Sequence, residues 1–550
     1  MKQKNLYRTA LSRTALSRKV LSRTVVLRAV LMFCLFMFAS YSAFANNVSV
    51  TNFSLTGRNA AEHYIMVKFD ITWENSFRVS TGPSNWDAAW VFVKYRIGTG
   101  AYQHAWLNNT GHVNPSGSTI STGLLDPALP FNQTTNPGIG AFIYRSADGT
   151  GTFSNTGVQL RWNYGANGVA DNAVIDISVY AIENVYVPQG SYYAGSGGTE
   201  YNHFYKYPTT TNPYQITSEG AITVGTATNN LYYTASTYAG DALGPIPAAF
   251  PKGYNAFYCM KYEISQQGYV DFLNSLTTVQ ASNRYSTSST GYRYGITASS
   301  GVYSTTNPFV ACNYISWADL AAYLDWSGLR PMTELEFEKS CRGTLPAVPN
   351  EYAWGTTGIA SSAYTLSNSG LTNENIATNY STNLGNAATW NTIGTGINGP
   401  VRVGIFAGNG LNTGRVTSGA TYYGIMEMTG NLYERSVTVG NPTGRGFTGS
   451  NGNGLLTATG DADALLWPGI TAVGAGFRGG SWIGDDTYLR VSARSLAALT
   501  ILPLLQLWRS GCSCGALARG YQYSELGFGA EPQQIFFLKV QILNNECKYE

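Results

Sequence analysis

FRGGSW at residues 477–482, followed by RVSARS at residues 490–495, is the stretch that decides the fold of this chain. The interval between the two blocks reads IGDDTYL and holds no cysteine. No cysteine occurs between residues 342 and 511, and no histidine follows His203. Cu(I) prefers thiolate ligands, and a histidine base usually activates a serine or cysteine nucleophile. The stretch therefore lacks the side chains of both chemistries.

Three helices are predicted upstream of this stretch from capping residues and apolar spacing. Serine or threonine at an N-cap accepts a hydrogen bond from a free backbone amide, and an acidic residue three positions later completes a capping box. Glycine ends a helix because it adopts left-handed backbone angles. The predicted caps and stops are Ser265; Ser316 with Asp319, ended by Gly328; and Thr333 with Glu336, ended by Gly343.

Several further blocks stand in a fixed order along the chain. They are VYVPQGSYYAG from Val185, PFVACNYISWADLAAYLDWSGLRPMTELEFEKSCRG at 308–343, EYAWG at 351–355 and YGIMEMTGNLYE at 423–434. With FRGGSW and RVSARS, the series resembles the formylglycine-generating enzyme, or sulfatase-modifying factor, family. The resemblance implies a compact, loop-rich α+β domain related to C-type lectin domains. It also suggests that Arg478 and Arg494 are buried structural arginines, with contact to an anionic ligand as the alternative.

The catalytic members of that family carry two copper-binding cysteines just after the GGS-aromatic block. Alignment from GGSW places these positions near Gly484 and Leu489, neither of which binds metal through its side chain. We therefore predict no catalytic residues and no copper. Cys512 and Cys514 are the alternative, as displaced substitutes. We also expect no iron, because the four histidines lack a two-His-plus-carboxylate spacing.

Calcium is the one metal that the resemblance leaves as a candidate. Asn431 and Glu434 match the family segment G-N-x-x-E, which supplies oxygen ligands to a structural calcium, and Ca²⁺ prefers such oxygens. The alternative is that both side chains only bond neighbouring loops. A second calcium site would start near Asn386, but its expected aspartate partner is not evident downstream.

The residues before this region have a β pattern. Apolar and polar residues alternate from Val48, from Tyr64 and from Ala89, and Gly/Asn/Pro-rich breaks separate the runs. We predict an N-terminal antiparallel β-sandwich over residues 46–181, followed by the sulfatase-modifying-factor-like domain over 182–498. The overall expectation is an α+β protein of two domains with an atypical tail over 499–550.

The N-terminus has the pattern of a signal peptide. Eight Lys/Arg and no acid occur in residues 1–30, an apolar run follows at 29–38, and Ala43-Phe44-Ala45 is a small-x-small cleavage pattern. A membrane anchor is the alternative, but the run is short for a span. Removing those eight from 34 Lys/Arg leaves 26 against 31 Asp/Glu, so the formal charge moves from +3 to −5. The basic balance therefore does not indicate nucleic-acid binding.

The family resemblance stops after Ser495. The family closes with a strand of the G-F-R-x-x-R type, and residues 499–550 have instead a different composition, with Cys512, Cys514 and Cys547. A lineage-specific tail and a translated frameshift both explain this. If the closing strand is missing, an unpaired strand edge remains. The pairing of these cysteines with Cys259, Cys312 and Cys341 stays open.

The leading hypothesis is an exported, non-catalytic member of the family, secreted or placed at the cell surface or in the periplasm, that acts as a binding or scaffold module. Its partner would be a protein or glycan of the cell envelope, with no nucleic acid and no stable membrane span after signal cleavage. One alternative is a formylglycine-generating-type oxidoreductase that acts on protein cysteine. A weaker alternative is a carbohydrate-binding adhesin, supported only by the 38 tyrosines and 12 tryptophans.

Overall fold

The computed structural model describes residues 48–287, 291–389, 397–483, 486–500, 538–543 and 546–549. Contacts divide the chain into residues 1–43 and residues 44–550, so every described residue belongs to the second unit. The predicted signal peptide lies outside the described residues, as do Gly484, Cys512 and Cys514. Among the described residues, no helix combines the length and the apolar character that crossing a membrane requires.

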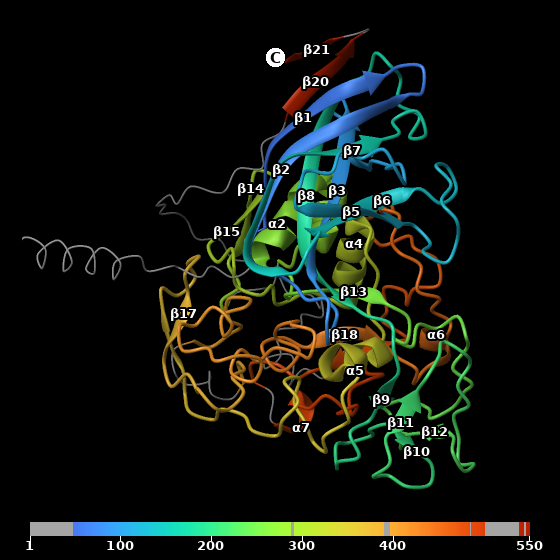
Figure 1. The fold of residues 1–550 in the computed structure, drawn as a ribbon, viewed down its shortest axis with the longest axis vertical. Coiled ribbons are helices and arrows are strands. Elements are labelled where there is room, and N and C mark those ends of the chain that lie inside the picture. The colour runs from blue at the N-terminus through green and yellow to red at the C-terminus, as the bar shows by residue number, and fades with distance from the viewer. Residues whose placement is uncertain are drawn as a thin grey trace, which may run out of the picture. The chain divides into compact units, whose positions relative to one another are not determined.

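Two antiparallel sheets dominate the first part of the fold (Figure 1). The smaller sheet has the order β1-β2-β7, made of Ser49–Asn59, Tyr64–Arg78 and Gly149–Trp162. The larger has the order β21-β20-β8-β3-β6-β5, with β13 also on β8 and β4 also on β3. Its strands are β3 Asp87–Ile97, β4 Gln103–His104, β5 Ser118–Leu124, β6 Gly138–Arg145, β8 Val174–Val187, β13 Phe257–Met260, β20 Leu538–Leu543 and β21 Glu546–Tyr549.

The central strand β3 is buried on both faces. Successive side chains along a strand point to opposite faces of the sheet, so β3 contributes to two cores. Its residues Val91 and Val93 pack into one core with Phe69 and Trp73 of β2. The predicted boundary at 181/182 lies inside β8, which continues to Val187 and pairs with β13. A sandwich as a separate N-terminal domain stays a prediction.

The opposite face of β3 packs against helices. Trp90 and Phe92 share a core with residues of α2, Gln266–Ser275, and α4, Trp317–Ser327. Phe92 meets Trp326 of α4 edge to face, at 5.0 Å between ring centroids. The remaining helices are α3 Thr278–Arg284, α5 Glu334–Arg342, α6 Pro442–Arg445 and α7 Asp486–Leu489.

The three predicted helices are confirmed with their caps. Ser265 begins α2, and Ser316 with Asp319 forms the capping box of α4, which Gly328 ends in a left-handed conformation. Thr333 and Glu336 form the capping box of α5. These helices form where the sequence supplies bonds for the free amides of the first turn.

The rest of the described chain is long loops fastened by short strand pairs. These are β9 (Tyr192–Ala194) with β11 (Tyr214–Ile216), β10 (Tyr205–Lys206) with β12 (Leu231–Tyr232), β14 (Ile296–Ser299) with β15 (Val302–Thr305), β16 (Thr365–Ser367) with β17 (Asn375–Thr378), and β18 (Glu434–Val437) with β19 (Ala475–Arg478). The expectation of a loop-rich α+β fold therefore holds at the level of mixed, sheet-rich architecture. A specific likeness to C-type lectin domains stays a prediction.

Candidate functional site

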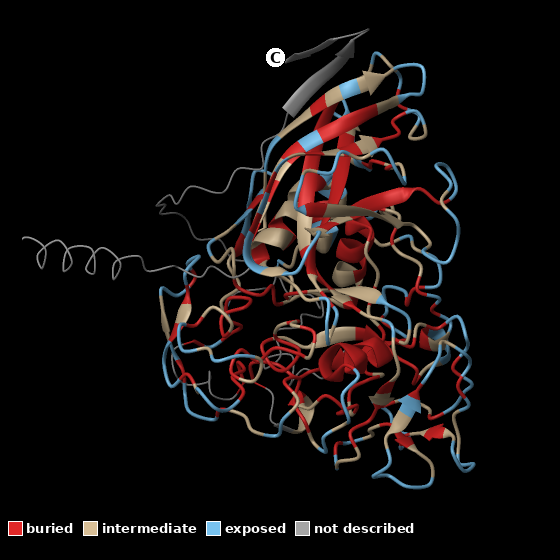
Figure 2. Ribbon diagram, in the orientation of Figure 1, coloured by how far each residue is buried: buried red, intermediate tan, exposed pale blue. Residues whose placement is uncertain are grey.

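The helix α5 is buried over its whole length, including its charged residues (Figure 2). Glu334 stands at the start of the helix and receives two arginines. Arg494 donates to both carboxylate oxygens, from Nε at 2.6 Å and from Nη2 at 3.0 Å, and Arg478 Nη1 donates at 3.0 Å. Thr438 and the Val439 amide each donate at 2.8 Å.

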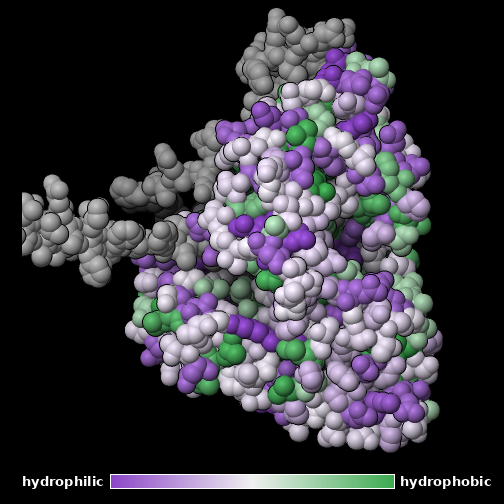
Figure 3. All heavy atoms as spheres, in the orientation of Figure 1, coloured by the Kyte–Doolittle hydropathy of each residue, from purple (hydrophilic) through white to green (hydrophobic). Residues whose placement is uncertain are grey.

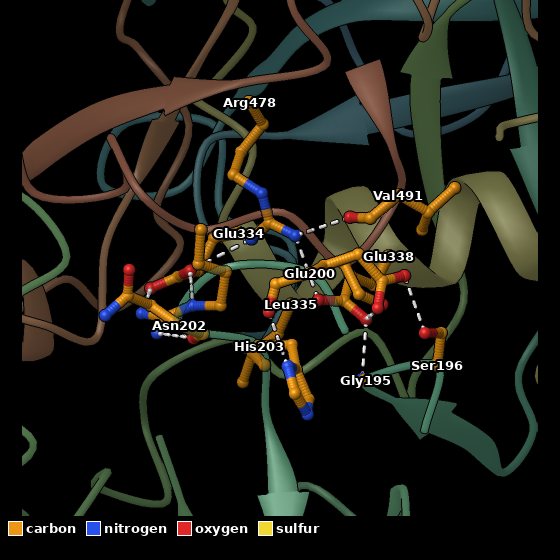
Figure 4. Close-up of polar contacts among 12 residues, drawn as sticks. Gly195, Ser196, Glu200, Asn202, His203, Glu334, Leu335, Glu338, Arg478 and Val491 are labelled. Atoms are coloured by element: carbon orange, nitrogen blue, oxygen red, sulfur yellow. Dashed lines mark hydrogen bonds and ion pairs between the residues drawn. The ribbon is translucent and has the colours of Figure 1, made fainter. Parts of the chain in front are cut away.

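Glu338, one turn further along α5, is held in the same way (Figure 4). Arg478 Nη2 donates to it at 2.9 Å and Arg342 Nη1 at 3.1 Å, while the Gly195 amide donates at 2.7 Å. Burial opposes ionisation of Glu338, but these two arginines outweigh it and lower the pKa of the carboxyl. We name Glu334, Glu338, Arg342, Arg478 and Arg494 the α5 charge network.

The α5 charge network explains why FRGGSW and RVSARS build the fold. The first block supplies Arg478 and the second supplies Arg494, and both fasten their loops to one helix. Both guanidinium groups are fully buried, so the expectation of buried structural arginines is confirmed. Their terminal nitrogens bond to protein groups, which does not favour contact with an anionic ligand.

One of the two positions that align with the family's cysteines is Leu489. Its side chain is buried and packs against Tyr352 and Trp354. A Cβ at Gly480 would come within 2.4 Å of Leu489 Cδ2, so the GGS segment itself closes over this side chain. The other position, Gly484, lies outside the described residues.

Cys259, Cys312 and Cys341 are free thiols. Burial raises the pKa of Cys259 to about 12 and also raises the pKa of Cys312 and of Cys341 well above the usual value. At neutral pH they are therefore protonated, whereas the thiolate is the form that binds copper or attacks a substrate.

Asn431 of the predicted calcium pair is fully buried and engaged by protein groups. Its Oδ1 accepts from the Val401 amide at 2.8 Å, its carbonyl oxygen accepts from the Trp482 amide at 2.7 Å, and its Nδ2 donates to Glu263. Within the described part of the chain, no group of three or more His, Cys, Asp or Glu side chains is placed to hold a metal ion. A cation here would have to share Asn431 Oδ1 with a backbone amide, so calcium stays a prediction.

Asn386, the third predicted ligand, uses its whole amide in local bonds. Oδ1 accepts from the Tyr364 hydroxyl and the Ser381 amide, both at 2.9 Å. Nδ2 donates to the carbonyls of Ser381 and Thr417, both at 2.8 Å. These contacts fasten three loops together, and the structure brings Asn386 into no contact with Asn431 or Glu434 that would make one site.

Glu434 instead lines a cavity of about 550 Å³. The cavity lies between β5, β13, the start of β18 and one side of α4 with the residues that follow it. Its apolar lining includes Met260, Leu324, Leu329, Met332, Met426 and Met428. On the face seen in Figure 3, hydrophobic residues lie scattered among hydrophilic ones, whereas the cavity gathers them. Such a volume is within the roughly 300–1,000 Å³ range of small-ligand pockets.

Three carboxylates meet beside this cavity. Glu263 and Glu434 line it, and the charge of Glu427 acts on Glu263. Burial raises the pKa of Glu434 to about 7, and burial together with the Glu434 charge raises that of Glu427 to about 8. Burial and the charges of both neighbours also raise the pKa of Glu263. Perturbed carboxyls in a cavity are a common mark of a functional site.

The sequence prediction found Glu434 but missed Glu263, Glu427 and the cavity. Glu263 stands between strand β13 and the N-cap of α2. This position in the sequence indicates only a connecting segment. Glu427 has a left-handed φ of 54°, a conformation that is unusual for glutamate and that single-letter patterns do not reveal. The cavity itself arises from contacts between segments far apart in the chain.

Comparison with protein families gives a match. The family model described as "Sulfatase-modifying factor enzyme 1-like domain" matches residues 216–501. This range holds α5, the cavity-lining strands β13 and β18, and both arginine-bearing blocks. No curated protein matches the chain.

Proposed function

The chain belongs to the sulfatase-modifying factor family, and from that premise we propose that it is an exported, non-catalytic member that acts as a binding or scaffold module at the cell surface. The observation that carries the proposal is the replacement of the family's cysteine positions. Leu489 is buried against aromatic rings, and no thiol occurs between residues 342 and 511.

Three buried thiols support the same proposal. Cys259, Cys312 and Cys341 are buried and protonated at neutral pH, so none offers the thiolate that Cu(I) requires. A binding role has a physical basis in the apolar cavity with its carboxylates. The rival proposal, a formylglycine-generating-type oxidase, would need Cys512 and Cys514, which lie outside the described residues.

A competition titration with a Cu(I) chelator tests the proposal. The full chain should take no tightly bound copper from the chelator. One equivalent of copper bound per chain, lost on Cys512→Ser or Cys514→Ser, would favour the oxidase. A parallel screen against glycans and envelope proteins tests the binding role, because a non-catalytic module must retain at least one partner.

Export has its own test. The exported protein should begin at Asn46, after cleavage behind Ala45. N-terminal sequencing of the secreted or periplasmic protein measures this directly. An intact chain that begins at Met1 and remains in the cytoplasm would contradict the proposal.

A further inference from the structure

The strand β13 has one paired and one unpaired edge. It pairs with β8, and the bond from the Lys261 amide to the Glu183 carbonyl fixes the register. Antiparallel alternation then turns the backbone N–H and C=O groups of Tyr258 and Met260 away from β8. Among the described residues no backbone group bonds to them, so this edge presents free donors and acceptors beside the cavity that Tyr258 and Met260 line.

The strand β18 lies at the same cavity, which Glu434 lines at the start of the strand. It pairs with β19 from Glu434 to Val437, and the Val437 amide bonds to the Met332 carbonyl at its far end. Two strands of different sheets thus flank one apolar cavity, and the edge of β13 that faces away from β8 is able to accept a further strand.

The carboxyl groups beside this edge have no cationic partner among the described residues. The Glu434 side chain has no hydrogen bond or ion pair to any described residue, and Glu263 receives only the Leu432 amide and the Asn431 side-chain amide. The two arginines of the cavity wall are already engaged. Arg330 forms a bidentate pair with Glu336, and Arg435 lies over the Phe477 ring at 4.0 Å.

We propose that the cavity between β13 and β18 is a slot for an extended segment of another protein, which adds as a β-strand and places one lysine or arginine against Glu434 and Glu263. The proposal deepens the binding role proposed above and rests on it. Added strands gain affinity from main-chain bonds and specificity from alternate side chains. Here the free groups of Tyr258 and Met260 supply the bonds, and the methionine-lined walls and the carboxylates supply the specificity.

An extended peptide fits these features better than a compact small molecule does. A small apolar ligand would fill the volume but would make no use of the backbone groups of Tyr258 and Met260, which lie on a half-buried strand. An added antiparallel strand bonds to every second residue of its neighbour, which matches the separation of Tyr258 and Met260. Its basic side chain pairs with the carboxyls of Glu434 and Glu263 and favours their ionised form, and no described cation occupies that place.

The test is fluorescence polarisation with the full chain in the presence of a calcium chelator. The probe is a labelled nine-residue peptide of alternating valine and threonine with lysine at its centre. One matched peptide carries glutamine in place of the lysine, and another has N-methyl groups on one backbone edge. We expect the lysine peptide to bind about tenfold more tightly than either matched peptide. The glutamine peptide loses the charge pair, and the N-methylated peptide loses main-chain bonds.

Glu434→Gln should abolish the preference for lysine over glutamine. The matched control, Glu62→Gln, removes an exposed carboxylate paired with Arg161 and should leave the preference unchanged. If Glu434→Gln does not fold, the N-methylated peptide with the unmodified chain still decides the question. Equal binding of the normal and N-methylated peptides, or no binding of any of them, overturns the proposal.

Two further outcomes separate the alternatives. Cross-linking of Tyr258 to this chain's own residues beyond Thr500 would assign the slot to the chain itself and overturn binding of another protein. Tight binding of a glycan or envelope protein that Glu434→Gln leaves unchanged would keep the proposed binding role and overturn the slot. The copper titration is independent of both results.

Discussion

The α5 charge network and the β13–β18 cavity both bury carboxylates, but they differ in what surrounds them. Glu334 and Glu338 are each held by two arginines, and their pKa values fall despite burial. Glu434 has no such partner, and burial raises its pKa. The first arrangement fastens loops to a helix, whereas the second leaves carboxyls and the edge of β13 available. Within one domain, the carboxyls paired with arginine belong to the scaffold, and the carboxyls that line the candidate site have no such partner.

The largest expected effect comes from removing one arginine of the α5 charge network. Arg478→Met should lower the free energy of unfolding by about 3–5 kcal/mol, because it leaves Glu334 and Glu338 buried with one arginine fewer each. Urea unfolding measures the loss. The control is Arg96→Met, which breaks the more exposed pair with Asp176 and should cost about 1 kcal/mol or less. Equal losses in the two variants would contradict the scaffold role.

A second prediction concerns Asp325, another buried carboxyl that forms no ion pair with a described cation. Asp325 of α4 is fully buried and accepts the amides of Asn453 and Asp463, both at 2.9 Å. Burial, reinforced by the Asp463 charge, raises the pKa of Asp325 from 3.8 to about 7. The nearby Lys94 donates to the Gly454 carbonyl and forms no ion pair with Asp325.

The pKa of the Asp325 carboxyl is higher in the folded protein than in the unfolded chain. The contribution of the protonated carboxyl to stability is therefore fully present below pH 3.8 and is lost as the pH rises through about 7. Stability should thus fall by about 2–4 kcal/mol from this group over that window. Asp325→Asn should flatten the fall. The measurement is urea unfolding of both proteins from pH 4.5 to pH 8, and parallel curves would contradict the prediction.

The smallest expected effect concerns calcium. If Asn431 and Glu434 bind it, chelation should lower the melting temperature by a few °C, on the order expected when a ligand at moderate excess is removed. Glu434→Gln should remove the dependence on chelator. Thermal melts over a calcium series measure this, and a melting curve that chelator leaves unchanged would end the calcium prediction.

The sequence predicted those parts of the fold that local chemistry controls. Ser265, Ser316 and Thr333 cap their helices as expected, because capping depends on residues within one turn. The partners of Arg478 are a different matter. Its pairing with Glu334 and Glu338 joins residues more than a hundred positions apart, and no local pattern shows which carboxylate meets which arginine.

The candidate site was harder to predict for the same reason. Glu434 was found through a motif, but the motif indicated calcium and not a cavity. Glu263 and Glu427 meet Glu434 only because β13, β18 and the preceding loop fold together. The unpaired edge on β13 depends on which strands are present beside it, which is a property of the whole sheet arrangement.

The most direct measurement of the central claim is mass spectrometry of a sulfatase-type cysteine peptide after incubation with the full chain, copper and oxygen. The account predicts an unchanged mass at the target cysteine, because Leu489 is buried where the family places a cysteine and no thiol lies between residues 342 and 511. Conversion of that cysteine to formylglycine, abolished by Cys512→Ser or Cys514→Ser, would contradict it.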